Sequence, residues 1–181
     1  MEVKIEVLLN DNKFNFLSDE NKAFISEFTR QMKIFGYDFG GEIENGFCWG
    51  NFMLIFSQIG SKTKKIIARI YIRDNNSIIW GKKEYKFSNG IVLRLYFSSI
   101  DKHNAYIENS PSHIKEPFIN DHGVCSHCKE NCRSRKIYTI AGKKMEKCDG
   151  IVFEYNDPKI ENIEDYMNIL RKFYEKKSQV K

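Results

Sequence analysis

The sequence has little of several features that define large protein classes. Only three of its 181 residues are proline, so a proline-rich linker is not expected. No apolar run approaches the roughly 20 residues that a membrane helix requires. The first stretch, MEVKIEVLLNDNKF, mixes acidic with apolar residues and lacks a small-residue cleavage site, unlike a secretory signal peptide. We therefore expect a cytoplasmic protein without a membrane partner.

The motifs of common enzyme classes are missing as well. The patterns H-E-x-x-H, G-x-S-x-G and G-x-G-x-x-G do not occur. Residues 60–63 (GSKT) lack the G-x-x-x-x-G-K-[ST] spacing of a phosphate-binding loop. There are only four histidines, and we expect His103 and His113 on exposed helical faces. With no visible nucleophile and base, we do not expect an enzyme.

The composition is that of a globular domain, with 41% hydrophobic and 29% charged residues. Abundant Lys, Asn and Ile are typical of low-GC bacterial coding. The net charge is +5, and its location is informative. Between Cys125 and Cys148 there are seven basic and two acidic residues, which leaves 22 of each sign elsewhere. All the surplus positive charge therefore lies in one short segment.

That segment, residues 122–150, is also rich in cysteine. Its spacing is C-x2-C-x3-C-x15-C, formed by Cys125, Cys128, Cys132 and Cys148. In a reducing compartment, clustered thiols bind metal more often than they form disulfides. We therefore predict a structural Zn²⁺ site with these four ligands. Because four cysteines fill a tetrahedral shell, we expect no catalysis at the metal. The fifth cysteine, Cys48, is expected to be a small buried hydrophobe.

Other interpretations of the cysteines stay open. Four cysteines also ligate iron–sulfur clusters, and a disulfide or unligated thiols are further alternatives. His122 or His127 could replace one cysteine as a ligand, although His127 lies inside the C-x-x-C loop, where a side chain normally points outward.

The long gap before Cys148 predicts a β-hairpin that turns at Ala141-Gly142. In that register the facing pairs are Arg135 with Cys148, Lys136 with Lys147, Tyr138 with Met145, and Ile140 with Lys143. The hairpin would return Cys148 to the neighbourhood of Cys132. Because a short basic hairpin with few apolar residues is marginal alone, we expect zinc to stabilise it. A structural zinc binds with about 10–16 kcal/mol, comparable with a whole domain's stability of about 5–15 kcal/mol.

Hydrophobic periodicity predicts an α+β fold with a mostly antiparallel sheet and helices packed on one face. Ser18 is a predicted N-cap, with acidic residues in the first turn that follows. We expect one domain over residues 1–181, with 122–150 as an inserted zinc hairpin. The predicted strands are 3–7, 51–57, 65–73, 77–80, 85–87, 90–97 and 150–155, and the predicted helices are 19–35, 101–109, a short one from Pro111, and 162–175.

Three resemblances accompany these patterns. The order of strands and helices resembles bacterial effector-binding, gyrase-inhibitor-like domains, which implies binding of small cationic or apolar molecules between two halves. Residues 48–108, from CWGNFMLIF to DKHNAYIE, are similar to small uncharacterised bacterial domains with three antiparallel strands and a helix. The segment HGVCSHCKENCRSRKIYTIAGKKMEKCDG resembles a cysteine module of uncharacterised low-GC bacterial proteins. These resemblances concern architecture and carry over no functional residue.

The sequence therefore favours a non-enzymatic protein with a structural zinc that presents a surface to a small-molecule ligand or a protein partner. One alternative is an effector-binding domain, with an aromatic pocket lined by Glu42, Trp49, Trp80 or Tyr96. A second alternative, less favoured because no helix carries a basic stripe, is a nucleic-acid-binding module. It would use the exposed ring of Tyr138 and the basic side chains of Arg133, Arg135, Lys136 and Lys147.

Overall fold

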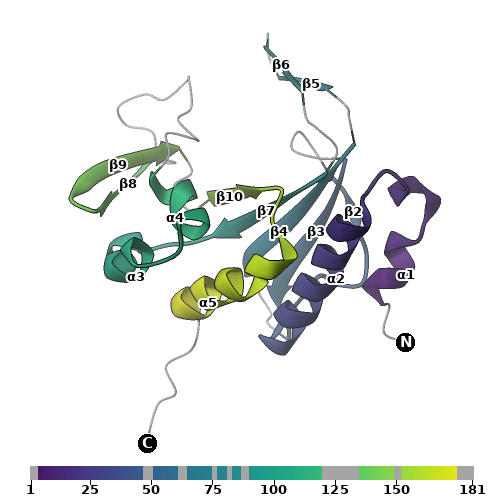
Figure 1. Ribbon diagram of the computed structural model, residues 1–181, viewed down its shortest axis with the longest axis horizontal. Coiled ribbons are helices and arrows are strands. Elements are labelled where there is room, and N and C mark those ends of the chain that lie inside the picture. The colour runs from purple at the N-terminus through teal and green to yellow at the C-terminus, as the bar shows by residue number, and fades with distance from the viewer. Residues whose placement is uncertain are drawn as a thin grey trace, which may run out of the picture. The chain divides into compact units, whose positions relative to one another are not determined.

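The protein is an α+β structure with a mostly antiparallel sheet and several helices, as the sequence predicts (Figure 1). Residues 77–80, 83–86, 135–136 and 148 are described by their backbone alone. The computed structural model describes residues 4–46, 51–60, 65–74, 77–80, 83–86, 90–119, 135–148 and 152–174.

The main sheet has the strand order β1-β3-β4-β7-β10, and β2 also pairs with β3. β1 and β2 are short and pair antiparallel with opposite ends of β3, which is itself antiparallel to β4. β5 and β6 form a separate two-stranded sheet. The strands are β1 (Tyr37–Asp38), β2 (Glu44–Asn45), β3 (Phe52–Gln58), β4 (Ile66–Arg73), β5 (Ser77–Trp80), β6 (Lys83–Lys86), β7 (Gly90–Tyr96) and β10 (Val152–Asn156).

Helix α2 (Asp19–Ile34) covers one face of this sheet (Figure 1). It begins where predicted, because the Ser18 hydroxyl accepts a hydrogen bond from the Asn21 amide at 3.2 Å and caps the first turn. The ring of Phe28 packs edge-on against Phe56 of β3, with centroids 5.4 Å apart. Both side chains are fully buried, so the helix is held by its apolar face.

The strand predicted for residues 3–7 is wrong. Residues Ile5–Leu9 form the short helix α1, which is followed by the 3₁₀ helix η1 (Asn12–Phe14). Ile5 and Leu9, four residues apart, are buried, whereas Val7 is 65% exposed. A strand would place Val7 on the same face as Ile5, so burial follows the helical period.

The remaining helices and the second hairpin lie later in the chain. They include a 3₁₀ turn and a helix where the sequence predicts residues 101–109 as helical, and a last helix close to the predicted 162–175. Their bounds are η2 (Ile100–His103), α3 (Asn104–Glu108), α4 (Ser112–Ile119), β8 (Arg135–Ile140), β9 (Lys143–Cys148), η3 (Ile160–Asn162) and α5 (Ile163–Tyr174).

The chain forms two compact units, each assembled from two segments. Unit 1 comprises Met1–Arg94 and Tyr155–Ile163, and unit 2 comprises Leu95–Glu154 and Glu164–Lys181. The core of unit 2 is aromatic: Phe97 lies 4.4 Å from Phe173 and 5.6 Å from Phe118, between ring centroids. Across the described ranges, no helix is long and apolar enough to cross a membrane.

Candidate functional sites: the cysteine hairpin and a cavity beside α2

The hairpin predicted within the cysteine segment is present, and its register is confirmed. Strands β8 and β9 pair antiparallel with Arg135 opposite Cys148, Tyr138 opposite Met145 and Ile140 opposite Lys143. The turn residues Ala141 and Gly142 both have positive φ, 51° and 72°. Two left-handed residues in a two-residue loop are typical of a type I′ turn, whose twist matches that of the flanking strands.

One face of the hairpin is packed into unit 2. Tyr138, Ile140 and Met145 are at most 4% exposed, whereas Ile137 on the other face is 51% exposed. The ring of Tyr138 lies edge-on to Phe153 at 6.3 Å. The hairpin thus gains apolar support from the rest of unit 2, which was not foreseen from the sequence.

The hairpin is also bonded to the end of α4. The Tyr138 hydroxyl donates to the carbonyl of Phe118 at 2.6 Å, and the Lys147 ammonium donates to the carbonyl of Pro117. Both carbonyls belong to the last turn of α4, where no intrahelical N–H is left to bond them. The two side chains thus cap the C-terminus of α4.

Two acidic side chains accept hydrogen bonds from the main chain of β8 and of the turn. The amide of Thr139 donates to Asp101 at 3.0 Å, and the amide of Ala141 donates to the carboxylate of Glu108. These residues come from η2 and α3, so three elements of unit 2 contact the hairpin through polar bonds.

Of the four predicted metal ligands, only Cys148 falls within the described ranges, as the last residue of β9 and by its backbone alone. Cys125, Cys128 and Cys132 lie outside the described residues, as do His122, His127 and Cys48. Among the side chains that are described, no three His, Cys, Asp or Glu groups converge on a point that could hold a metal ion.

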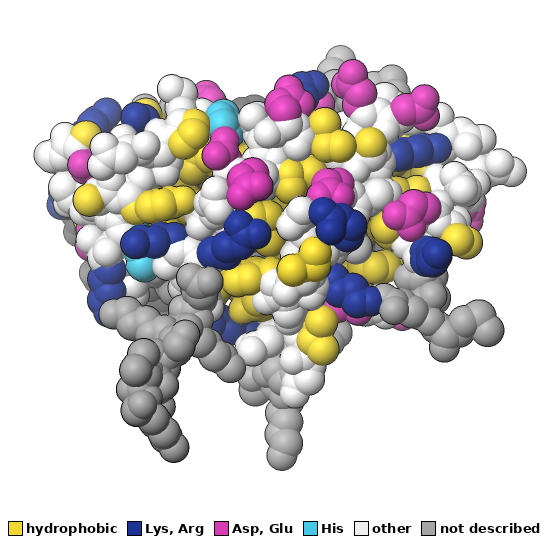
Figure 2. Space-filling model, turned by 60° about the horizontal axis from the view of Figure 1, so that its bottom comes forward, with side chains coloured by type: hydrophobic (Ala, Val, Ile, Leu, Met, Phe, Trp, Pro, Cys, Tyr) yellow, Lys and Arg dark blue, Asp and Glu magenta, His cyan; other side chains and the backbone are white. Residues whose placement is uncertain are grey.

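The structure corrects the side chains assigned to nucleic-acid binding. Tyr138, predicted to be exposed, is 3% exposed, and burial raises the pKa of its hydroxyl. Lys147 is 4% exposed, with its ammonium 5.0 Å from the centre of the Phe153 ring. Arg133 is outside the described residues, and for Arg135 and Lys136 only the backbone is described. On the face shown in Figure 2, acidic and basic side chains are interspersed.

The two histidines expected on exposed faces are in fact half-buried in unit 2. His113 lies 3.0 Å from the carboxylate of Asp165. The ring of His103 packs 4.1 Å from that of Phe173, and its pKa is lowered first by burial and then by the nearby ammonium groups of Lys172 and Lys102.

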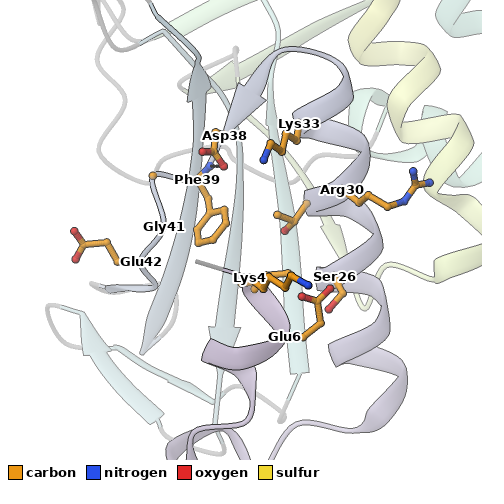
Figure 3. A pocket seen from close by; sticks show the side chains of 12 residues that line it. Lys4, Glu6, Ser26, Arg30, Lys33, Asp38, Phe39, Gly41 and Glu42 are labelled. Atoms are coloured by element: carbon orange, nitrogen blue, oxygen red, sulfur yellow. Dashed lines mark hydrogen bonds between the residues drawn. The ribbon is translucent and has the colours of Figure 1, made fainter. Parts of the chain in front are cut away.

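Unit 1 contains a cavity of about 930 Å³ that sequence reasoning missed (Figure 3). It lies between α1, α2 and the loop that follows β1, so its lining comes from three separate segments that no single motif connects. Basic and acidic groups line it in equal number, three of each. The lining residues are Lys4, Ile5, Glu6, Ser26, Thr29, Arg30, Lys33, Asp38, Phe39, Gly40, Gly41 and Glu42.

The pocket predicted for an effector-binding domain is not assembled from the described residues. Glu42 belongs to the lining of the cavity in unit 1, but Figure 3 shows its side chain directed away from it. Tyr96 belongs to unit 2, Trp49 lies outside the described residues, and Trp80 is described by its backbone alone.

Comparison of the chain with protein-family models, with curated proteins and with solved structures finds no match.

Proposed function

We propose that the chain is a non-enzymatic zinc protein in which Cys125, Cys128, Cys132 and Cys148 bind one structural Zn²⁺. In the cytosol, the compartment we infer for it, thiols remain reduced and available to metal. Four thiolates would complete a tetrahedral shell and leave no open position for a substrate.

The observation that supports this proposal most is the anchoring of the hairpin to α4. Segment 120–134, which carries three of the cysteines, leaves the last turn of α4 and returns at Arg135. Lys147, next to Cys148 in sequence, bonds the carbonyl of Pro117 in that turn, and Arg135 is the cross-strand partner of Cys148. The described residues on either side of the segment therefore contact the strand end that carries the fourth cysteine.

The chain between Cys132 and Arg135 is short enough to keep Cys132 near the end of the hairpin. Cys132 precedes Arg135 by three residues, so its Cα is at most about 11 Å from that of Arg135. Because the contacts of β8 and β9 with α4 already constrain the chain on both sides of residues 120–134, ligation costs less closure entropy than in a free chain. The buried ammonium of Lys147 and the other basic residues of the segment would offset part of the charge of −2 on a four-thiolate zinc.

Elemental analysis tests the proposal directly. Protein purified without chelating steps is expected to contain about one zinc per chain, in line with a closed four-ligand site. Cys128→Ser should lose the metal and lower the free energy of unfolding by several kcal/mol. Cys48→Ser is the matched control, since it removes a cysteine outside the segment and should retain the zinc.

Other outcomes would identify the competing chemistries. Iron in the purified protein, together with visible absorbance, would indicate an iron–sulfur cluster in place of zinc. Metal-free protein with intact stability would overturn the proposal. Replacing zinc by Co²⁺ and recording its absorption counts the thiolate ligands. His122→Ala and His127→Ala should leave that spectrum unchanged if all four ligands are cysteines.

A further inference from the structure

The cavity in unit 1 has the features of a binding site, and its lining along α2 follows one helical stripe. Ser26, Thr29 and Lys33 recur at intervals of three and four residues, which places them on one face of the helix. Ser26 and Lys33 are seven residues apart and therefore span about 10 Å along the axis. The cavity thus has two distinguishable ends.

The two ends carry charges of both signs (Figure 3). Lys33 and Asp38 lie at one end, and Lys4, Glu6 and Ser26 gather at the other. Arg30 points away from the cavity and is bound by the Glu27 carboxylate through two hydrogen bonds of 2.7 Å. Without Arg30 and Glu42, both of which point away, the lining still holds two basic and two acidic groups.

The middle of the cavity is largely apolar but includes one hydroxyl without a partner. Phe39 and Ile5, which are 7% and 5% exposed, supply the apolar wall. Thr29 is only 7% exposed, and its hydroxyl oxygen finds no hydrogen-bond partner in the part of the chain that the structure describes. A buried hydroxyl normally has a partner, and in a helix it commonly bonds the carbonyl four residues earlier. The oxygen itself has almost no accessible surface, so a ligand in the cavity reaches it only if the Thr29 side chain changes rotamer.

We propose that the cavity binds a short zwitterionic peptide of two or three residues, whose termini are held at its two ends. A lining with balanced charges complements a ligand that carries both an ammonium and a carboxylate group and no net charge. An extended peptide of this length spans roughly 7–10 Å, which matches the spacing of Ser26 and Lys33 along α2. The volume of about 930 Å³ is within the range of small-molecule sites.

Titration calorimetry with trialanine tests this proposal, with dialanine and free alanine as shorter probes. Trialanine or dialanine should bind saturably. N-acetyl-trialanine and trialanine amide, each lacking one terminal charge, should bind about tenfold more weakly or worse, since each loses a charge-assisted hydrogen bond. If free alanine binds more tightly than either peptide, the assigned ligand length is wrong.

Two substitutions locate the site without removing its structure. In Asp38→Asn the side-chain oxygen can still accept from the Phe39 amide, the 2.8 Å bond that shapes the loop, while the charge is lost. Because trialanine has a single ammonium group, one of Asp38→Asn and Glu6→Gln, the one at the end that holds it, should weaken trialanine binding about tenfold, and the other should weaken it less. Glu20→Gln, an exposed charge of α2 outside the lining, should leave it unchanged. Absence of saturable binding, or an equal effect of Glu20→Gln, would overturn the proposal. Zinc content does not enter this test, so its outcome is separate from that of the metal site.

Discussion

At the scale of single residues, His103 is the group most clearly shaped by its surroundings. Its ring lies against Phe173, and its Nδ1 atom is buried without a hydrogen-bond partner among the described residues. Burial and the neighbouring lysines lower its pKa. In mild acid, His103 therefore binds a proton less readily in the folded protein than in the unfolded chain.

This environment predicts a loss of stability in mild acid. A histidine in the unfolded chain titrates near pH 6.5. Because the pKa of His103 is lower in the folded protein, the unfolded chain binds more protons below that pH, and the free energy of unfolding falls as the pH is lowered. Urea unfolding at pH 7.5 and at pH 5 should show a smaller acid-induced loss for His103→Gln than for the parent protein. An equal loss in both would contradict the assignment.

Single side chains also mark where sequence reasoning fails. Alternation along the hairpin groups Tyr138, Ile140 and Met145 on one face, but it does not say whether that face meets a core or solvent. Tyr138 and Lys147 are predicted as exposed because their partners, the carbonyls of α4, lie some 20 to 30 residues away in sequence. A main-chain acceptor leaves no signature that a sequence pattern can reveal.

At the scale of elements, the hairpin turn carries a backbone strain that its sequence does not relieve. Ala141 adopts φ of 51°, a left-handed conformation that costs a residue with Cβ about 1–2 kcal/mol and that asparagine and glycine tolerate better. The bond from its amide to Glu108 uses the main chain and survives substitution.

Ala141→Asn should therefore stabilise the protein by about 1 kcal/mol, because Asn-Gly is a favoured pair for this turn. Ala141→Val should destabilise it, since a β-branched side chain crowds the left-handed region. Urea denaturation of both variants measures the difference. The same stability for Asn and Val would argue against a type I′ turn.

Elements with a strong local signal were predictable, and short ones were not. The α2 helix combines the Ser18 cap with a long apolar stripe, and the hairpin combines alternation with a glycine turn. The five residues of α1 fit both a strand and a helix, and only the burial of Ile5 and Leu9 decides between them. The cavity could not be foreseen, because its lining is brought together only by tertiary packing.

At the scale of the whole molecule, the two units are interleaved along the chain. The chain passes between them after Arg94, after Glu154 and after Ile163, and neither unit is a single continuous segment. The proposed zinc ligands all belong to unit 2, and the cavity belongs to unit 1.

Hydrogen exchange with and without a chelator should show whether zinc removal affects unit 2 and leaves unit 1 unchanged. If zinc ties segment 120–134 to the hairpin, its removal should speed amide exchange in α4, β8 and β9, because local openings there lose a stabilising constraint. Strands β3 and β4 of unit 1 should keep their protection. Exchange that is unchanged everywhere after zinc removal, or raised equally in both units, would contradict this expectation.

The contact between the hairpin and α4 tolerates substitutions better on the helix than on the hairpin. Its donors are the side chains of Tyr138 and Lys147, while its acceptors are peptide carbonyls that every amino acid carries. A change of residue type at position 117 leaves its acceptor in place, whereas a change at 138 or 147 deletes a donor. Over evolution, the residue types at the end of α4 can therefore change more freely than those at positions 138 and 147 of the hairpin.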